Sequence, residues 1–142
     1  DFEVFVIRPK GKLIQSENQN SLIVYCKYKK YNLLFMGDGD INSFNVLPDE
    51  MKRNITIMKS GHHGAIETIS DEMALNTQLF VISTGFNSYN HPHPDTIAMI
   101  NKYNKSYIRT DYSNAINVKL EPEKIKLYFY SPKKRKFIRT FD

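Results

Sequence analysis

The sequence LLFMGDGD, residues 33–40, joins four consecutive apolar residues to an abrupt alternation of glycine and aspartate. An unbroken apolar run of this length indicates a strand that is buried on both faces, because a strand with one wet face would alternate. Glycine and aspartate readily adopt the backbone angles of turns and end the strand. The pattern predicts an inner strand whose carboxyl end carries Asp38 and Asp40.

The segments on either side extend this strand into a sheet. Ser70 is expected to cap a helix that ends near Thr77, and a second helix is expected from about Asp95 to Tyr103. Further strands are predicted at 2–7, 21–28, 55–58, 79–83, 106–109, 115–120, 124–130 and 137–139. This order predicts the α/β (α+β) class, a mixed sheet with helices on one face. The other face is also apolar, and we expect it to need a partner layer.

The composition is that of a globular domain. The chain has 142 residues, with 41% hydrophobic and 25% charged residues, as in an ordinary soluble protein. A single cysteine, Cys26, excludes a disulfide scaffold. No apolar run approaches the roughly 20 residues of a membrane span, and no secretory signal is visible. A cytoplasmic location is therefore the default expectation.

The net charge of +5 is concentrated at one end of the chain. Residues 119–142 hold eight basic and three acidic residues, which equals the whole excess. The run Lys133-Lys134-Arg135-Lys136 is its centre. Such a patch attracts phosphate backbones through counterion release, whereas the plainer interpretation is a solvated terminal hairpin.

Histidines follow two of the other predicted inner strands. All four histidines of the chain lie between positions 62 and 93, as His62, His63, His91 and His93. Because the carboxyl ends of neighbouring strands meet at one edge of such a sheet, these side chains are expected near Asp38. Carboxylate and imidazole together suit zinc, manganese or iron, and a metal-bound hydroxide is one chemistry that they allow.

Each of these features also has a structural interpretation. A Gly-Asp-Gly-Asp stretch after a strand is often only a turn. Asp38, Asp40 and Asn42 also imitate the first half of an EF-hand loop, although Ser43 and Asp49 stand where that loop needs Gly and Glu. The adjacent histidines could be a solvent-exposed pair, and His91 and His93 could be ordinary loop residues.

Four motifs occur in a characteristic order, and together they cover roughly residues 20–120. They are LLFMGD at 33–38, IMKSGHHG at 57–64, STG at 83–85 followed by NHP at 90–92, and RTD at 109–111 followed by Ala115-Ile116. This series resembles the metallo-β-lactamase-fold domain of ComEC-type competence proteins, which are DNA-uptake channel proteins. The resemblance implies an αββα sandwich with a two-metal site for zinc or manganese, and hydrolysis of phosphodiesters such as DNA.

The resemblance also implies roles for particular residues. Asp38 would bridge two metals, and His63 would be a metal ligand. His62 would touch the substrate phosphate or move a proton, and His91 with Pro92 would line the phosphate site. Thr110 and Asp111 match a motif without an implied role.

The principal metal motif of that family, H-x-H-x-D-H, is absent from these 142 residues. We therefore expect residues 1–142 to be a single partial domain, the C-terminal half of the sandwich, and an enzyme only if that motif lies upstream. Its partner would then be the missing N-terminal half or a second copy of the chain, and a bacterial membrane protein could carry it as a soluble domain. The alternative is a non-catalytic nucleic-acid-binding or structural module of the same fold.

Overall fold

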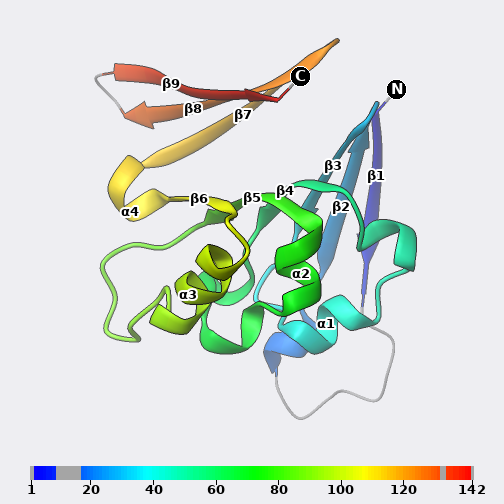
Figure 1. The fold of residues 1–142 in the computed structure, drawn as a ribbon, viewed down its shortest axis with the longest axis vertical. Helices are drawn as coiled ribbons and strands as arrows, with labels where there is room; N and C mark the ends of the chain where they lie inside the picture. Colours follow the sequence, from blue (N-terminus) through cyan, green and yellow to red (C-terminus); the bar gives the residue numbers. More distant parts are fainter. Residues whose placement is uncertain (1, 9–16, 132–133, 142) are drawn as a thin grey trace.

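The computed structural model describes residues 2–8, 17–131 and 134–141. Its larger sheet has six strands in the order β1-β2-β3-β4-β5-β6 (Figure 1). Neighbours among β1, β2 and β3 are antiparallel, and β3 to β6 run parallel. The carboxyl ends of β3 to β6 therefore share one edge. The strands are β1 Phe2–Ile7, β2 Ile23–Tyr28, β3 Tyr31–Phe35, β4 Ile55–Lys59, β5 Thr77–Ile82 and β6 Ser106–Arg109.

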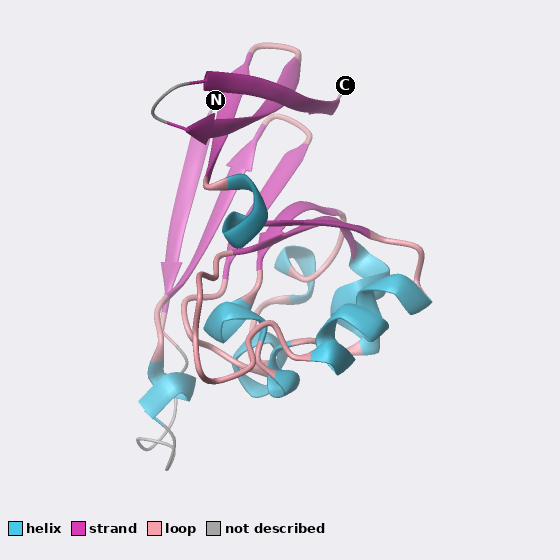
Figure 2. Ribbon diagram, turned by 90° about the vertical axis from the view of Figure 1, so that its left-hand side faces the viewer, coloured by secondary structure: helices cyan, strands magenta, loops and turns pink. Residues whose placement is uncertain are grey.

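Helices pack on one face of this sheet (Figures 1 and 2). Phe44, Met73 and Ile100 are wholly buried there in one cluster with strand residues Leu34 and Met58. Among the described residues, no helix is long and apolar enough to cross a membrane. The helices of this face are α1 Ile41–Asn45, α2 Asp71–Asn76 and α3 Pro94–Lys102, and the 3₁₀ turns are η1 Glu17–Asn20, η2 Asp49–Met51, η3 Gly61–Gly64 and η4 Ile66–Thr68.

The last three strands form a separate antiparallel sheet on the opposite face. The short helix α4 Thr110–Ser113 leads into β7 Ala115–Glu121, which pairs with β8 Lys124–Ser131, and β8 pairs with β9 Lys134–Phe141. Ile125 and Leu127 of β8 are wholly buried in a second cluster with Leu33, Ile57 and Leu79. The predicted partner layer of this face is present in the chain itself over β3 to β5, where β7–β9 supply it.

Neighbouring residues of the inner strands belong to different hydrophobic clusters, one on each face of the sheet. Leu33 packs toward the small sheet and Leu34 toward the helices, and Leu79 and Phe80 divide in the same way. This arrangement confirms the strand buried on both faces and the mixed α+β class with helices on one face. The basic terminal segment forms the predicted hairpin of β8 and β9, although Lys133 lies outside the described residues.

The turn between β2 and β3 is shorter than predicted. The strands predicted at 21–28 and from Leu33 leave residues 29–32 for a turn, but β3 already begins at Tyr31, which pairs with Tyr28. The turn is therefore only two residues long, and Lys29 adopts a positive φ of 53° within it. A tight hairpin turn requires a left-handed residue at this place. Lysine rarely adopts that conformation, so the sequence contains no sign of a two-residue turn here.

Candidate functional site

Two glycines bring the loops after β3 and β4 into direct backbone contact. A Cβ atom on Gly61 would overlap the carbonyl oxygen of Gly39, so only glycine allows this approach. The carbonyl oxygen of Gly37 also accepts two hydrogen bonds, one from the backbone N–H of His62 (3.1 Å) and one from Nζ of Lys59 (3.0 Å). The loop that carries Asp38 is therefore fixed to the loop that carries the adjacent histidines.

The ammonium of Lys59 lies at this junction, because it donates to the carbonyl oxygen of Gly37. Burial lowers the pKa of its ammonium from the ordinary value of 10.5, and the carboxylate of Asp38 opposes that shift. Asp38 is half-buried, and its backbone N–H donates to Oγ of Ser21 at 3.2 Å. The predicted metal ligand Asp38 thus lies at the expected strand end, beside a partly desolvated cation.

His62 and His63 both have left-handed backbones, with φ values of 38° and 55°. This conformation costs about 1–2 kcal/mol for each residue with a side chain. Strain of this kind persists where the surrounding structure fixes it, and it concentrates at functional sites. The two strained residues turn their rings to different hydrogen-bonding partners.

The two rings differ in which nitrogen is free. The side-chain amide of Asn18 donates to Nδ1 of His62 at 3.2 Å, which leaves the proton of the neutral ring on Nε2. Nδ1 of His63 lies 2.7 Å from the carbonyl oxygen of Ser83 and donates to it, which leaves a lone pair on Nε2. His62 therefore presents a donor, and His63 presents the free nitrogen that a metal ligand needs.

His91 belongs to the loop after β5, and its ring lies next to that of His62. The ring centroids of His62 and His91 are 5.4 Å apart, and the ring of Tyr89 stacks on His91 with a centroid distance of 6.1 Å. Burial first, and then the neighbouring imidazoles of His62 and His63, lower the pKa of His91 from its ordinary value of 6.5, so its ring is neutral at pH 7. Its Nδ1 is buried and has no hydrogen-bond partner among the described residues.

Asp40 and His93 have structural roles instead. The carboxylate of Asp40 accepts a hydrogen bond from the backbone N–H of Ser43 and caps α1. Nδ1 of His93 accepts from the backbone N–H of Asp95 and caps α3. The EF-hand interpretation fails for the same reason, because Asp40 is engaged as a helix cap.

Asp38 and His63 have the ligand types that zinc and manganese bind, but two ligands are too few to hold either metal tightly. A carboxylate and an imidazole with a free Nε2 are ordinary ligands, but zinc takes four ligands in structural sites and three protein ligands in catalytic ones. Within residues 2–8, 17–131 and 134–141, no group of three or more His, Cys, Asp or Glu side chains could hold a metal ion. Asp38 and His63 do not complete a metal site by themselves.

Three other residues take part in the site, and the sequence assigned a role to none of them, although Thr84 and Thr110 lie in two of the motifs. Asn18 precedes His62 by 44 positions, and no local pattern links them. Thr84 and Thr110 exchange two hydrogen bonds, from the backbone N–H of Thr84 to Oγ1 of Thr110 (2.8 Å) and from that hydroxyl to the carbonyl oxygen of Thr84 (2.6 Å). Thr110 thus fastens the loop of His91 to the start of α4, and Asp111 is ion-paired with Arg109.

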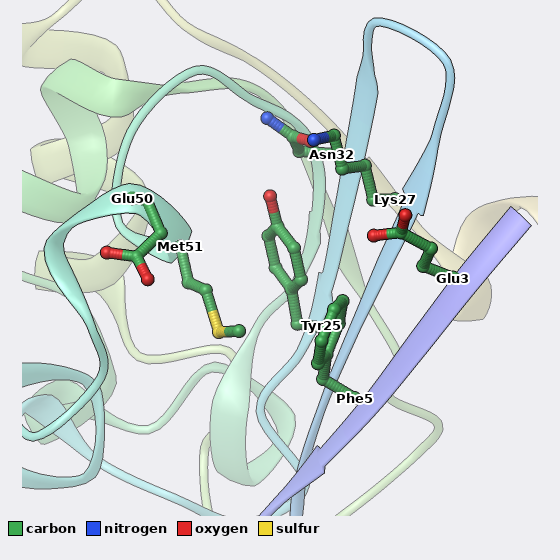
Figure 3. A pocket seen from close by; sticks show the side chains of 7 residues that line it. All are labelled: Glu3, Phe5, Tyr25, Lys27, Asn32, Glu50 and Met51. Atoms are coloured by element: carbon green, nitrogen blue, oxygen red, sulfur yellow. The ribbon is translucent and has the colours of Figure 1, made fainter.

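Two pockets differ in their relation to these residues. One of about 210 Å³ lies at the histidines and is lined by His63, Thr84, Gly85, Asn87, Tyr89 and His91. Another, of about 270 Å³, is lined by residues of β1, β2, β3 and η2 and contains none of the histidines (Figure 3). Tyr25 stands at its centre, where burial first, and then Glu50 and Glu3, raise the pKa of the phenol.

Comparison with known proteins finds a distant relative. No family model matches the chain. ComE operon protein 3 of Bacillus subtilis (strain 168) is 27% identical over 123 residues, which cover 82% of this chain. The chain spans 16% of the length of that relative. This similarity supports a distant relation to the competence proteins that the motif series indicated, and it extends over most of the chain.

Proposed function

We propose that this chain is part of a metal-dependent hydrolase domain of a ComEC-like competence protein, with the metallo-β-lactamase fold and with phosphodiesters, DNA in particular, as substrate. The distant similarity to ComE operon protein 3 supports the competence relation. The edge of the sheet where Asp38, His62, His63 and His91 gather supports a phosphate-directed site.

The observation that carries the proposal is the opposite hydrogen bonding of two adjacent histidines. Asn18 leaves His62 with a donor at Nε2, and Ser83 leaves His63 with an acceptor at Nε2. A phosphodiester needs a donor for its anionic oxygen, and a metal needs a lone pair. The chain offers a donor at His62 and a lone pair at His63, which are adjacent in the sequence. The neutral ring of His91 lies next to His62.

Each residue has a proposed role. His62 donates from Nε2 to a non-bridging phosphate oxygen, and His91 lines the same phosphate site. Asp38 and His63 are the donors that this chain contributes to zinc or manganese, whose further ligands come from outside the described residues.

The first test is zinc uptake in equilibrium dialysis by the chain and by single variants. Two ligands hold zinc only weakly, so the dialysis uses zinc in large excess over the protein. We expect Asp38→Ala and His63→Ala to lower the zinc that is bound under this condition. His93→Asn is the matched control, because asparagine preserves the cap of α3 and the residue lies outside the site. Equal uptake by all four proteins would contradict the assigned ligands.

The second test is hydrolysis of bis(p-nitrophenyl) phosphate, with added zinc or manganese, by the whole hydrolase domain of which this chain is proposed to be a part. Loss of a positioned donor typically lowers turnover by about 10²- to 10³-fold, and we expect this loss for His62→Gln with little change in zinc uptake. Hydrolysis that is the same in His62→Gln and His93→Asn would contradict the role of His62.

One observation favours a second function, a non-catalytic nucleic-acid-binding module. The described residues contain no three-ligand group, and the segment 119–142 carries the net positive charge. In that case DNA affinity falls steeply with salt. It also stays unchanged in His63→Ala, and no preparation hydrolyses phosphodiesters.

A further inference from the structure

The loop between β5 and α3 exposes two aromatic side chains. Phe86 is fully exposed and Tyr89 is 77% exposed. Both lie within a few residues of His91 in the sequence, and Tyr89 also lines the pocket at the histidines. Aromatic rings that are not needed for the core and stand beside a polar site are typical of surfaces that bind a ligand.

Tyr89 continues a series of rings that leads into the site. Its ring lies nearly parallel to His91, with an interplanar angle of 25° and a centroid distance of 6.1 Å. His91 in turn meets His62 edge-on, at 67° and 5.4 Å. One face of Tyr89 is therefore supported by His91, and the high exposure of the residue leaves the rest of the ring open to solvent.

The loop holds Tyr89 in place through Asn87. The side-chain oxygen of Asn87 accepts hydrogen bonds from the backbone N–H groups of Tyr89 (3.1 Å) and His91 (3.0 Å). Its side-chain nitrogen donates to the carbonyl oxygens of Gly85 and His91, at 2.8 Å each. Because these bonds fix the backbone that carries Tyr89, little backbone freedom is lost when a ligand stacks on the ring.

The pocket next to Tyr89 has the size of a single ring system. Its volume is about 210 Å³, below the range of roughly 300–1,000 Å³ that is usual for drug-sized ligands. Its walls combine the Tyr89 ring with imidazole and amide groups. A planar heterocycle with polar edges matches these walls, and the donor of His62 nearby matches an attached anion.

We propose that Tyr89 is a stacking platform for an unpaired nucleobase of single-stranded DNA, and that the phosphate next to this base is bound at His62 and His91. This inference rests on the proposed function and specifies the form of its substrate. A base in a duplex is already stacked on both faces, so only an unpaired base can use the exposed ring. Stacking also tolerates any base sequence, because every base has a flat face.

The test is fluorescence anisotropy with a short fluorescein-labelled oligothymidylate and with an abasic oligomer of the same backbone. We expect the wild-type chain to bind the oligothymidylate more tightly than the abasic oligomer. Tyr89→Leu should weaken binding of the oligothymidylate by roughly 5- to 150-fold and leave binding of the abasic oligomer unchanged. Tyr89→Phe keeps the ring and should keep the affinity.

Tyr112→Leu is the matched control. Tyr112 is 80% exposed, like Tyr89, but lies on α4 outside the pocket lining. Equal affinity of the wild-type chain for both oligomers, or an unchanged affinity in Tyr89→Leu, would overturn the inference. Base-dependent binding without hydrolysis by any preparation would count against the hydrolase alone. Hydrolysis of the oligothymidylate with the same KM in Tyr89→Leu would count against the stacking platform alone.

Discussion

The side-chain amide of Asn18 donates a hydrogen bond to Nδ1 of His62, over a distance of 3.2 Å and a separation of 44 residues. Asn18 belongs to η1, which precedes β2, whereas His62 follows β4. A residue remote in sequence thus decides which nitrogen of the candidate phosphate-binding histidine carries the proton.

Replacement of Asn18 should change the tautomer of His62. In the wild type we expect the neutral ring to carry its proton on Nε2, because Nδ1 accepts from the amide. In Asn18→Asp the new carboxylate accepts from Nδ1–H and favours the opposite tautomer and the charged ring. The ¹⁵N chemical shifts of the His62 ring nitrogens measure this change, and identical shifts in both proteins would contradict it.

The contact between Gly61 and Gly39 should make Gly61 intolerant of a methyl group. Gly61→Ala forces the two site loops apart, and overpacking of this kind costs about 1–3 kcal/mol of unfolding free energy. Gly85→Ala is the control, since a Cβ atom there would meet nothing within 4 Å. Urea denaturation compares the two variants, and an equal stability of both would refute a fixed junction.

The packing of the small sheet on the large one can be tested at Leu127. This side chain is wholly buried between the sheets, and truncation of such a residue typically costs about 2–5 kcal/mol. Leu75→Ala makes the same chemical change at a residue of α2 that is 57% exposed, and we expect a change within about 0.5 kcal/mol. If Leu127→Ala were as mild as Leu75→Ala in thermal or urea unfolding, β7–β9 would not pack on β3–β5.

Glu121 should make the stability of the small sheet depend on acid pH. Hydrogen bonds from Lys126 and then Lys119 lower the pKa of this carboxyl from 4.5 to about 2. Its folded pKa is depressed, so its stabilising effect is complete above pH 4.5 and is lost as the pH falls toward 2. The difference in unfolding free energy between the wild type and Glu121→Gln should shrink over that range. A difference that does not vary with pH would exclude this ion-paired carboxylate.

Local patterns predicted the parts of the fold that depend on neighbouring residues. The run at Leu33 and Leu34 predicted a strand buried on both faces, and Ser70 predicted the start of α2, where its hydroxyl accepts from the backbone N–H of Met73. The cover of the second face was not predicted. Alternation at Ile125 and Leu127 shows that β8 has an apolar face, but it does not say which surface that face meets.

The candidate site was also predictable only in part. Glycines and histidines after apolar strands predicted which loops would meet, because strand ends gather at one edge of a parallel sheet. The roles of Asn18 and Thr110 depend on contacts between distant segments, and such contacts leave no periodic signal in the chain. His93 was grouped with the other histidines by position alone, and its side chain caps a helix instead.

The glycine junction also bears on how such a site could diversify. The loops after β3 and β4 touch through Gly39 and Gly61, so an insertion in either one would have to be matched by a change in the other. Gly85 has open space around it, so the residue type at this position can change independently of that junction. We therefore expect variation in ligand preference to accumulate between Thr84 and His91, while the segments 36–40 and 59–64 stay constant in length.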